Sequence, residues 1–202
     1  VIEALDQAMF ARICGAWTWV RAEKIDDQLV IAVDGKTVRG ARHKDQKAPH
    51  LVAALTHDTG LVVGQVQVDA KTNEIPAMID LLGLMDLHGV VVTADALHTQ
   101  TNTAKFITAA GGDFVLTVKA NNPTLLAALK ALPWKKVPKI SQVDRSHGRR
   151  VQRTVQAVTV PDWIDYPGTR QVLRVAGWKN IAEGRRYHSR HLDKTANLLL
   201  TS

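Results

Sequence analysis

The chain has 202 residues, of which 46% are hydrophobic and 22% charged. This length and composition predict one globular domain with a sizeable core and exclude a disordered protein. The net charge of +7 favours an anionic partner, and nucleic acid is the commonest one. The single cysteine, Cys14, excludes an internal disulfide and a cysteine zinc site and is typical of a reducing cytoplasm. There is no secretory signal and no apolar run long enough to span a membrane.

The first segment, residues 1–28, is expected to be mainly helical. Apolar residues at helical spacing predict an amphipathic helix over residues 1–22 that packs on a sheet or on a partner. Trp17 and Trp19 could stack on bases, but we favour core packing for them, as is usual for aromatic residues at helical spacing. Because the sequence begins at Val1 without a methionine, we expect it to be part of a longer chain.

The stretch LVIAVDGKTVRG, residues 29–40, carries an acid where a strand should be buried. Apolar residues 30–33 run directly into Asp34, as in a central strand that is covered on both faces. A carboxylate there costs several kcal/mol to desolvate unless a cation or donors compensate it. Asp-Gly is also a strong hairpin signal, so a turn competes with a metal-binding or catalytic role. A phosphate-binding loop is excluded, because Val30 stands where its first glycine is needed.

A second stretch, GVVVTADALHTQ at residues 89–100, has the same pattern. Three valines form a short buried-type strand, and Asp95 follows its end. Two apolar strands that each lead into an aspartate are what a two-carboxylate metal site on adjacent strands requires, and Mg²⁺ prefers such oxygen ligands. The structural alternative is that Asp95 merely caps the helix that follows.

Four motifs, in this order, carry a family resemblance: IAVDGKTVRGAR, HLVAALTHDTGLVVGQVQVDAKTNEIPAM, VVVTADALHTQ and DFVLTVKANNP. From about residue 31 to residue 149 the chain resembles the DDE-type transposases of bacterial insertion sequences, in the group that includes the H-repeat-associated proteins. The resemblance implies Asp34 and Asp95 as the first two acids of an Asp-Asp-Glu triad, with Mg²⁺ or Mn²⁺ as cofactor. It also implies a bacterial cytoplasmic enzyme that cleaves and transfers DNA strands, with insertion-sequence ends and target DNA as partners and a homo-oligomer as a further option.

The elements expected between residues 29 and 134 follow the order of the fold that this resemblance implies. Strands at 50–55 and 61–68, a helix at 74–84, a helix at 101–110, a strand at 113–118 and a helix at 124–132 accompany the two acid-bearing strands. This is the order of an α/β ribonuclease-H-like core: a mixed sheet of three antiparallel strands and then alternating helix and strand, with helices on both faces. In that fold the first and fourth strands are neighbours, so Asp34 and Asp95 would face one metal site.

A third acid within the core is left open. Asn73 is placed to cap the helix at 74–84, and Glu74 then lies in its first turn, where a negative charge is favourable. Lys71, Asn73 and Glu74 also match the family's Lys-Thr/Ser-Asn-Glu-Ile motif, so Asn73 and Glu74 could support the site. A hydrolytic nuclease of the same fold would need Glu74 or Asp69 as a third ligand.

Basic residues near the expected strand ends are candidates for DNA-phosphate contacts, although each could equally be a solvated surface charge. Lys36 and Arg39 follow Asp34, Lys119 follows the strand at 113–118, and Arg149 lies in a Ser-His-Gly-Arg-Arg run. In that run His147 is a possible supporting residue and is not expected to ligate a metal on its own.

The part from residue 135 to residue 202 is expected to be basic and strand-rich, and to belong to the same domain. Here the sequence departs from the family, with Val151 where relatives have an acid and no third-acid motif before Ser202; His188 and His191 are expected at the surface. We therefore expect a catalytic-domain fragment of a DDE transposase with little or no strand transfer alone. The alternative is a non-catalytic remnant that binds DNA or a full-length transposase.

Overall fold

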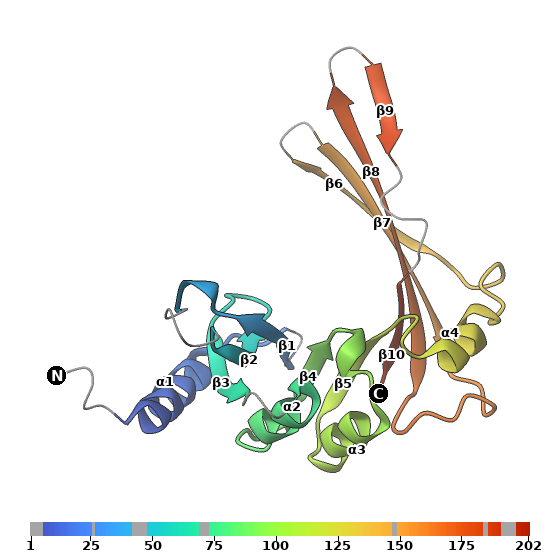
Figure 1. Cartoon of the computed structure of the whole chain (residues 1–202). Helices are drawn as coiled ribbons and strands as arrows, with labels where there is room; N and C mark the ends of the chain where they lie inside the picture. Colours follow the sequence, from blue (N-terminus) through green and yellow to red (C-terminus); the bar gives the residue numbers. More distant parts are fainter. Residues whose placement is uncertain are drawn as a thin grey trace. The chain divides into compact units, whose positions relative to one another are not determined.

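The protein is a mixed α/β structure, known here from a computed structural model (Figure 1). The structure describes residues 6–25, 27–41, 48–68, 73–146, 149–183, 186–190 and 197–202. These hold ten strands and four α-helices. The chain divides into two compact units, residues 1–116 and residues 117–202. No helix within the described ranges is long and apolar enough to cross a membrane.

Unit 1, residues 1–116, is built on a mixed sheet with the order β3-β2-β1-β4-β5. Strands β1 to β3 form the expected antiparallel meander, whereas β4 runs parallel to β1 and β5 runs parallel to β4. The strands are β1 (Leu29–Thr37), β2 (His50–Thr56), β3 (Val62–Val68), β4 (Val90–Ala94) and β5 (Asp113–Val118).

Three α-helices and two short 3-10 helices accompany this sheet. They are α1 (Gln7–Arg21), η2 (Arg39–Ala41), α2 (Glu74–Leu82), η3 (Ala96–His98) and α3 (Thr101–Ala109). Helix α2 buries one apolar face, which includes Met78 and Leu81, and α2 contacts β2 and β3. The strands contribute Ile31, Val52 and Phe114 to the same core, all fully buried. The alternate apolar residues of β1 and the apolar residues at helical spacing on α2 therefore pack together in one apolar layer.

The structure corrects the turn interpretation of Asp34 and Gly35. Strand β1 runs straight through both residues to Thr37, and it pairs with β2 from Ile31 to Thr37. Its pairing with β4 is shorter and covers Leu29 to Val33 only. The Asp-Gly pair therefore lies within a strand, at the point where one of its two neighbours ends.

The packing face of α1 also differs from the expectation. Trp17 is 57% exposed, so the prediction of core packing is wrong for this residue, whose ring lies 4.0 Å from the guanidinium of Arg21. The helix contacts β3 through small residues instead: a Cβ on Gly15 would lie 2.6 Å from the carbonyl oxygen of Val63, and Thr18 donates a hydrogen bond to the Val62 carbonyl. Periodicity identified the helix but could not tell which of its faces would be covered.

Unit 2, residues 117–202, combines one helix with long antiparallel strands. Its sheet has the order β10-β8-β7-β6, and β9 also pairs with β8. The elements are α4 (Pro123–Lys130), β6 (Ile140–Ser146), β7 (Arg149–Thr159), β8 (Gln171–Glu183), β9 (Arg186–Arg190) and β10 (Asn197–Thr201). Pro123 occupies the first turn of α4, as expected for a proline at a helix start.

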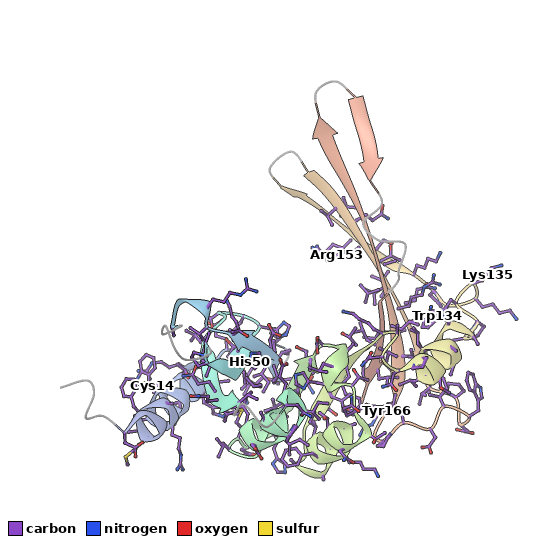
Figure 2. The ribbon with its side chains drawn as sticks, in the orientation of Figure 1. Cys14, His50, Trp134, Lys135, Arg153 and Tyr166 are labelled. Carbon is purple, nitrogen blue, oxygen red and sulfur yellow. The ribbon has the colours of Figure 1, made fainter. Side chains whose placement is uncertain are left out.

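The core of unit 2 gathers around Trp134, which is labelled in Figure 2. Its indole Nε1 donates to the carbonyl of Leu129 at the end of α4. The buried amide of Gln156 on β7 donates to the carbonyls of Trp134 and Val137, at 2.7 and 2.9 Å. The two bonds from Gln156 satisfy carbonyl groups that are outside any helix or strand, and so they fix the chain after α4 against the sheet.

Candidate functional site

The register of two parallel strands brings Asp34 and Asp95 together. The last paired residues of β1 and β4 are Val33 and Ala94, and each aspartate is the next residue of its chain. Since side chains alternate along strands and the two strands are in register, Asp34 and Asp95 start on the same face of the sheet. Adjacent strands lie roughly 4.8 Å apart, so two carboxylates meet at this edge.

The same face carries a histidine that the sequence did not single out. His57 follows β2, and its Nε2 lies 2.8 Å from the hydroxyl of Thr93, two residues before Asp95. Because the Thr93 hydroxyl itself donates to the carbonyl of Ile31, it accepts from His57. Lys36, two residues beyond Asp34, also lies on this face and is exposed. The face therefore has both acidic and basic groups around the paired aspartates.

Asp95 has a structural role as well. Its Oδ1 accepts a hydrogen bond of 2.9 Å from the backbone N–H of Leu97 and thus caps η3. The capping interpretation is confirmed, but it uses only one carboxylate oxygen and orients the group by a bond to the backbone. The side chain of Asp34 is exposed. Capping and ligand binding are therefore compatible at Asp95.

Behind this edge of the sheet, Glu74 is held by a histidine. The predicted cap is confirmed, since Asn73 Oδ1 accepts from the Ile75 N–H and begins α2. Glu74 Oε1 lies 2.6 Å from His50 Nε2, and His50 Nδ1 lies 2.8 Å from the hydroxyl of Thr37. His50, which is labelled in Figure 2, links the end of β1 to the start of α2. A carboxylate with such a partner has a fixed orientation.

Gly35 makes room for the Glu74 carboxylate. A Cβ atom built on Gly35 would overlap Glu74 Oε2, so every larger residue would displace one of the two groups. Gly35 lies next to Asp34 but faces the opposite side of β1, because side chains alternate along a strand. The glycine is therefore explained by close approach of a side chain and not by a turn.

His98 completes the polar cluster from the other strand. It lies three residues after Asp95 and is only 1% exposed, and its Nε2 is 3.8 Å from Glu74 Oε2. Burial lowers the pKa of His98, and the negative charges of Asp95, Glu74 and Asp34 oppose this shift without cancelling it. The imidazole is thus neutral at neutral pH. Its Nδ1 has no hydrogen-bond partner among the described residues.

The donor set at the two aspartates suits a hard divalent cation. Mg²⁺ is commonly held by one or two carboxylates together with water and substrate phosphates, and Mn²⁺ accepts the same oxygen ligands. Within the described ranges, no three His, Cys, Asp or Glu side chains are arranged to hold a metal ion. The two aspartates therefore fit a cation that takes its remaining ligands from elsewhere.

The expected phosphate-binding residues are placed only in part. Lys36, Arg39 and Lys119 are exposed, and Lys119 directly follows β5. Arg149 begins β7, but its side chain lies outside the described set, as do those of His147 and Asp69. His188 and His191 likewise have no described side chain.

These features describe an α/β protein with two carboxylates at the ends of adjacent parallel strands. The chain belongs to the family of the transposase DDE domain, whose model matches residues 25–167. The recognised resemblance to insertion-sequence transposases is thereby confirmed.

Relatives and a solved structure show how far this similarity extends. A protein encoded in the dhlA 3′ region of Xanthobacter autotrophicus is 37% identical over 87% of this chain and 60% of its own length. The H repeat-associated putative transposase YhhI of Escherichia coli K12 is 31% identical over 91% of this chain and 54% of its own length. The chain thus spans about half to three fifths of these relatives. A solved structure of a piggyBac transposase synaptic complex with hairpin DNA aligns with 86% of this chain and with 33% of its own length, at 12% identity and a TM-score of 0.43.

Proposed function

We propose that this chain is a catalytic-domain segment of an insertion-sequence transposase and that Asp34 and Asp95 bind a divalent cation at the scissile DNA phosphate. The observation that carries this proposal is the parallel register of β1 and β4, which sets the two aspartates side by side on one face. The chain belongs to a transposase family, and the resemblance implies that the reaction is metal-dependent DNA strand cleavage and transfer.

The strand order supports a ribonuclease-H-like core. In unit 1 the order β3-β2-β1-β4-β5, with β2 antiparallel to β1 and with β4 and β5 parallel to it, makes the first and fourth strands neighbours. This is the arrangement that the family resemblance implies. We therefore propose that unit 1 is a ribonuclease-H-like core with helices on both faces of its sheet.

In this proposal the protein positions DNA and neutralises its charge. A divalent cation bound at the two aspartates would activate the attacking water or 3′-hydroxyl and stabilise the leaving oxygen. Lys36 and Arg39, exposed just beyond Asp34, would hold the phosphate backbone next to the scissile bond, and Lys119 and Arg149 are further phosphate contacts. The cap on Asp95 would keep that carboxylate in a ligating orientation before DNA arrives.

We expect strand transfer by residues 1–202 alone to be weak or absent. The described residues supply two carboxylates at the edge of the sheet and no three-residue metal group. This observation also favours the second candidate, a non-catalytic segment that binds DNA or another copy of a transposase. The first candidate requires metal binding at the aspartates, and the second does not.

The test is a calorimetric titration of Mn²⁺ into the 202-residue chain, beside the Asp34→Asn and Asp95→Asn variants, followed by a plasmid-nicking assay. We expect the chain to bind Mn²⁺ and each variant to lose that binding, because the neutral amide lacks the negative charge by which a carboxylate attracts the cation. Asp80→Asn is a matched control, since Asp80 is an exposed acid on α2 within the same unit. Unchanged Mn²⁺ binding in both aspartate variants would exclude the metal site and leave the non-catalytic candidate.

A further inference from the structure

We propose that Glu74 and His98 form a positioning pair behind the two aspartates, which holds the ends of β1 and β4 in the geometry that binds the cation. This inference rests on the proposed function and deepens it, because it assigns a role to groups that are on the other side of the sheet edge. It treats Glu74 as a residue that acts through its neighbours and not as a metal ligand.

The first step is that the Glu74 carboxylate is fixed before any ligand binds. Its Oε1 is 2.6 Å from His50 Nε2, and His50 is in turn bound to the Thr37 hydroxyl. The Asn73 cap fixes the first turn of α2, which carries Glu74. The Glu74 carboxylate is thus held directly by His50 of β2 and indirectly by Thr37 of β1, and its side chain is only 27% exposed.

The second step is that the same carboxylate touches both acid-bearing segments. Its Oε2 packs on the backbone of Gly35, the residue after Asp34, where a side chain could fit only if the Glu74 carboxylate moved. It also lies 3.8 Å from Nε2 of His98, the residue that ends the short helix capped by Asp95. Glu74 therefore contacts both of the segments that carry the two aspartates.

The third step concerns why a charged group should be kept there. Keeping a neutral imidazole and a half-buried carboxylate at a sheet edge costs desolvation free energy, and apolar packing in place of buried charged groups is often neutral or stabilising. The cluster combines His98 at 1% exposure with three acids whose charges act on it. Partners outside the ligand set often orient ligands in this way, and their loss typically weakens metal binding by about 10- to 100-fold.

The direct experiment is Mn²⁺ titration of the 202-residue chain and its Glu74→Gln variant, with the thermal midpoint recorded for both. Glutamine keeps the shape of the side chain and can still accept a bond from His50, so we expect the chain to stay folded. We expect Mn²⁺ affinity to fall by about 10- to 100-fold. The matched control Asp80→Asn removes an exposed carboxylate from the same helix and should leave the affinity unchanged.

Two further variants separate a positioning role from a merely structural one. In a double-mutant cycle, Glu74→Gln and His98→Gln together should weaken Mn²⁺ binding no more than the worse single change, since the two act as one unit. Gly35→Ala places a methyl group where Glu74 Oε2 lies, and it should reproduce the Glu74→Gln loss although every carboxylate remains.

The outcomes distinguish this inference from the function on which it rests. If Asp34→Asn and Asp95→Asn abolish Mn²⁺ binding while Glu74→Gln binds as tightly as the unaltered chain, the metal site stands and the positioning pair is rejected. Additive losses in the cycle would also overturn the pair. If Mn²⁺ binding is absent or is retained by both aspartate variants, the proposed function itself fails.

Discussion

The two units of this chain differ in sheet type and in charge. Unit 1, residues 1–116, has 10 of the 26 lysines and arginines and 14 of the 19 acids. Unit 2, residues 117–202, has the other 16 lysines and arginines and the other 5 acids. Unit 1 places parallel strands next to each other at its acidic edge, and unit 2 is an antiparallel sheet of long strands. The overall charge of +7 thus conceals a net −4 in one unit and a net +11 in the other.

The net charge of the whole chain therefore says nothing about the charge around the candidate metal site, which lies in the acidic unit 1. Carboxylates that bind a cation need local negative potential, whereas contact with a phosphate backbone needs excess positive charge. The excess of positive charge lies in unit 2 and the paired aspartates lie in unit 1, although Lys36 and Arg39 of unit 1 are also proposed phosphate contacts. The comparison predicts that changes to the lysines of unit 2 alter DNA affinity and leave metal affinity unchanged.

Removing three exposed lysines of unit 2 should have the largest effect and would sharpen the comparison. Lys135, Lys136 and Lys139 follow α4, and the side chain of Lys135 extends from the ribbon in Figure 2. If all three contact phosphate, changing them to glutamine should reduce the steepness of log K against log salt concentration by about 2.7. The unaltered chain gains affinity as salt falls from 1 M to 0.1 M, and the variant should gain about 500-fold less over that range. Fluorescence anisotropy with duplex DNA at several salt concentrations measures this slope. Lys105→Gln, at an exposed site of α3 in unit 1, is the control, and a slope change of about 0.9 there, the full effect of one phosphate contact, would break the comparison.

The second prediction tests whether the units unfold separately. Leu81 on α2 is fully buried, so Leu81→Ala should cost about 2–5 kcal/mol of the unfolding free energy of unit 1. Calorimetry should show one transition shifted to lower temperature while that of unit 2 stays in place. Leu84→Ala, at a 62% exposed site just after α2, should change little. A joint shift of all transitions would mean that the units unfold as one.

The third prediction concerns the stability of unit 2 at high pH. Burial raises the pKa of Tyr166 to about 12 from its ordinary value of 10.0. The folded state therefore holds this proton more tightly, and unfolding should become easier as the pH rises from 10 to 12, with a maximum loss of about 3 kcal/mol. Absorbance at the tyrosinate band and urea unfolding at several pH values measure both effects. Tyr166→Phe should abolish this part of the pH dependence; if it persists, another group is responsible.

The smallest effect is expected at a buried amide of unit 2. Gln156→Ala removes the bonds to the carbonyls of Trp134 and Val137 and should cost about 1–3 kcal/mol. Chemical denaturation followed by tryptophan fluorescence is the measurement. The exposed Gln171 at the start of β8 provides the control, because Gln171→Ala removes a side chain from the surface. Equal losses at both positions would show that the buried bonds contribute nothing specific.

Much of unit 1 could be predicted from the sequence, since its strands and helices follow simple periodicities. Helix α3 and strand β5 lie within one residue of the expected ranges. The pairing of β1 with β4 came from the family resemblance, because no local pattern encodes which strands become neighbours.

The cluster around Glu74 could not be predicted in this way. The contacts of Glu74 with His50 and His98 join residues that are 24 positions apart, and periodicity carries no information about such pairs. One signal was available: a glycine within a strand often marks the close approach of another group, yet Asp34-Gly35 also matches a turn. For α1, helical spacing is equally compatible with either face turned to the sheet, and the choice depended on Gly15.

The in-register pairing of β1 with β4 has a consequence for how the chain can change in length. Because side chains alternate with a period of two, inserting one residue into β1 before Asp34 would turn that carboxylate to the opposite face from Asp95. Insertions in the loops between the two acids would leave their pairing intact. Within β1 and β4, an insertion or deletion of an odd number of residues before either acid would therefore separate the two carboxylates. In the loops between the strands, the number of residues can vary without this effect.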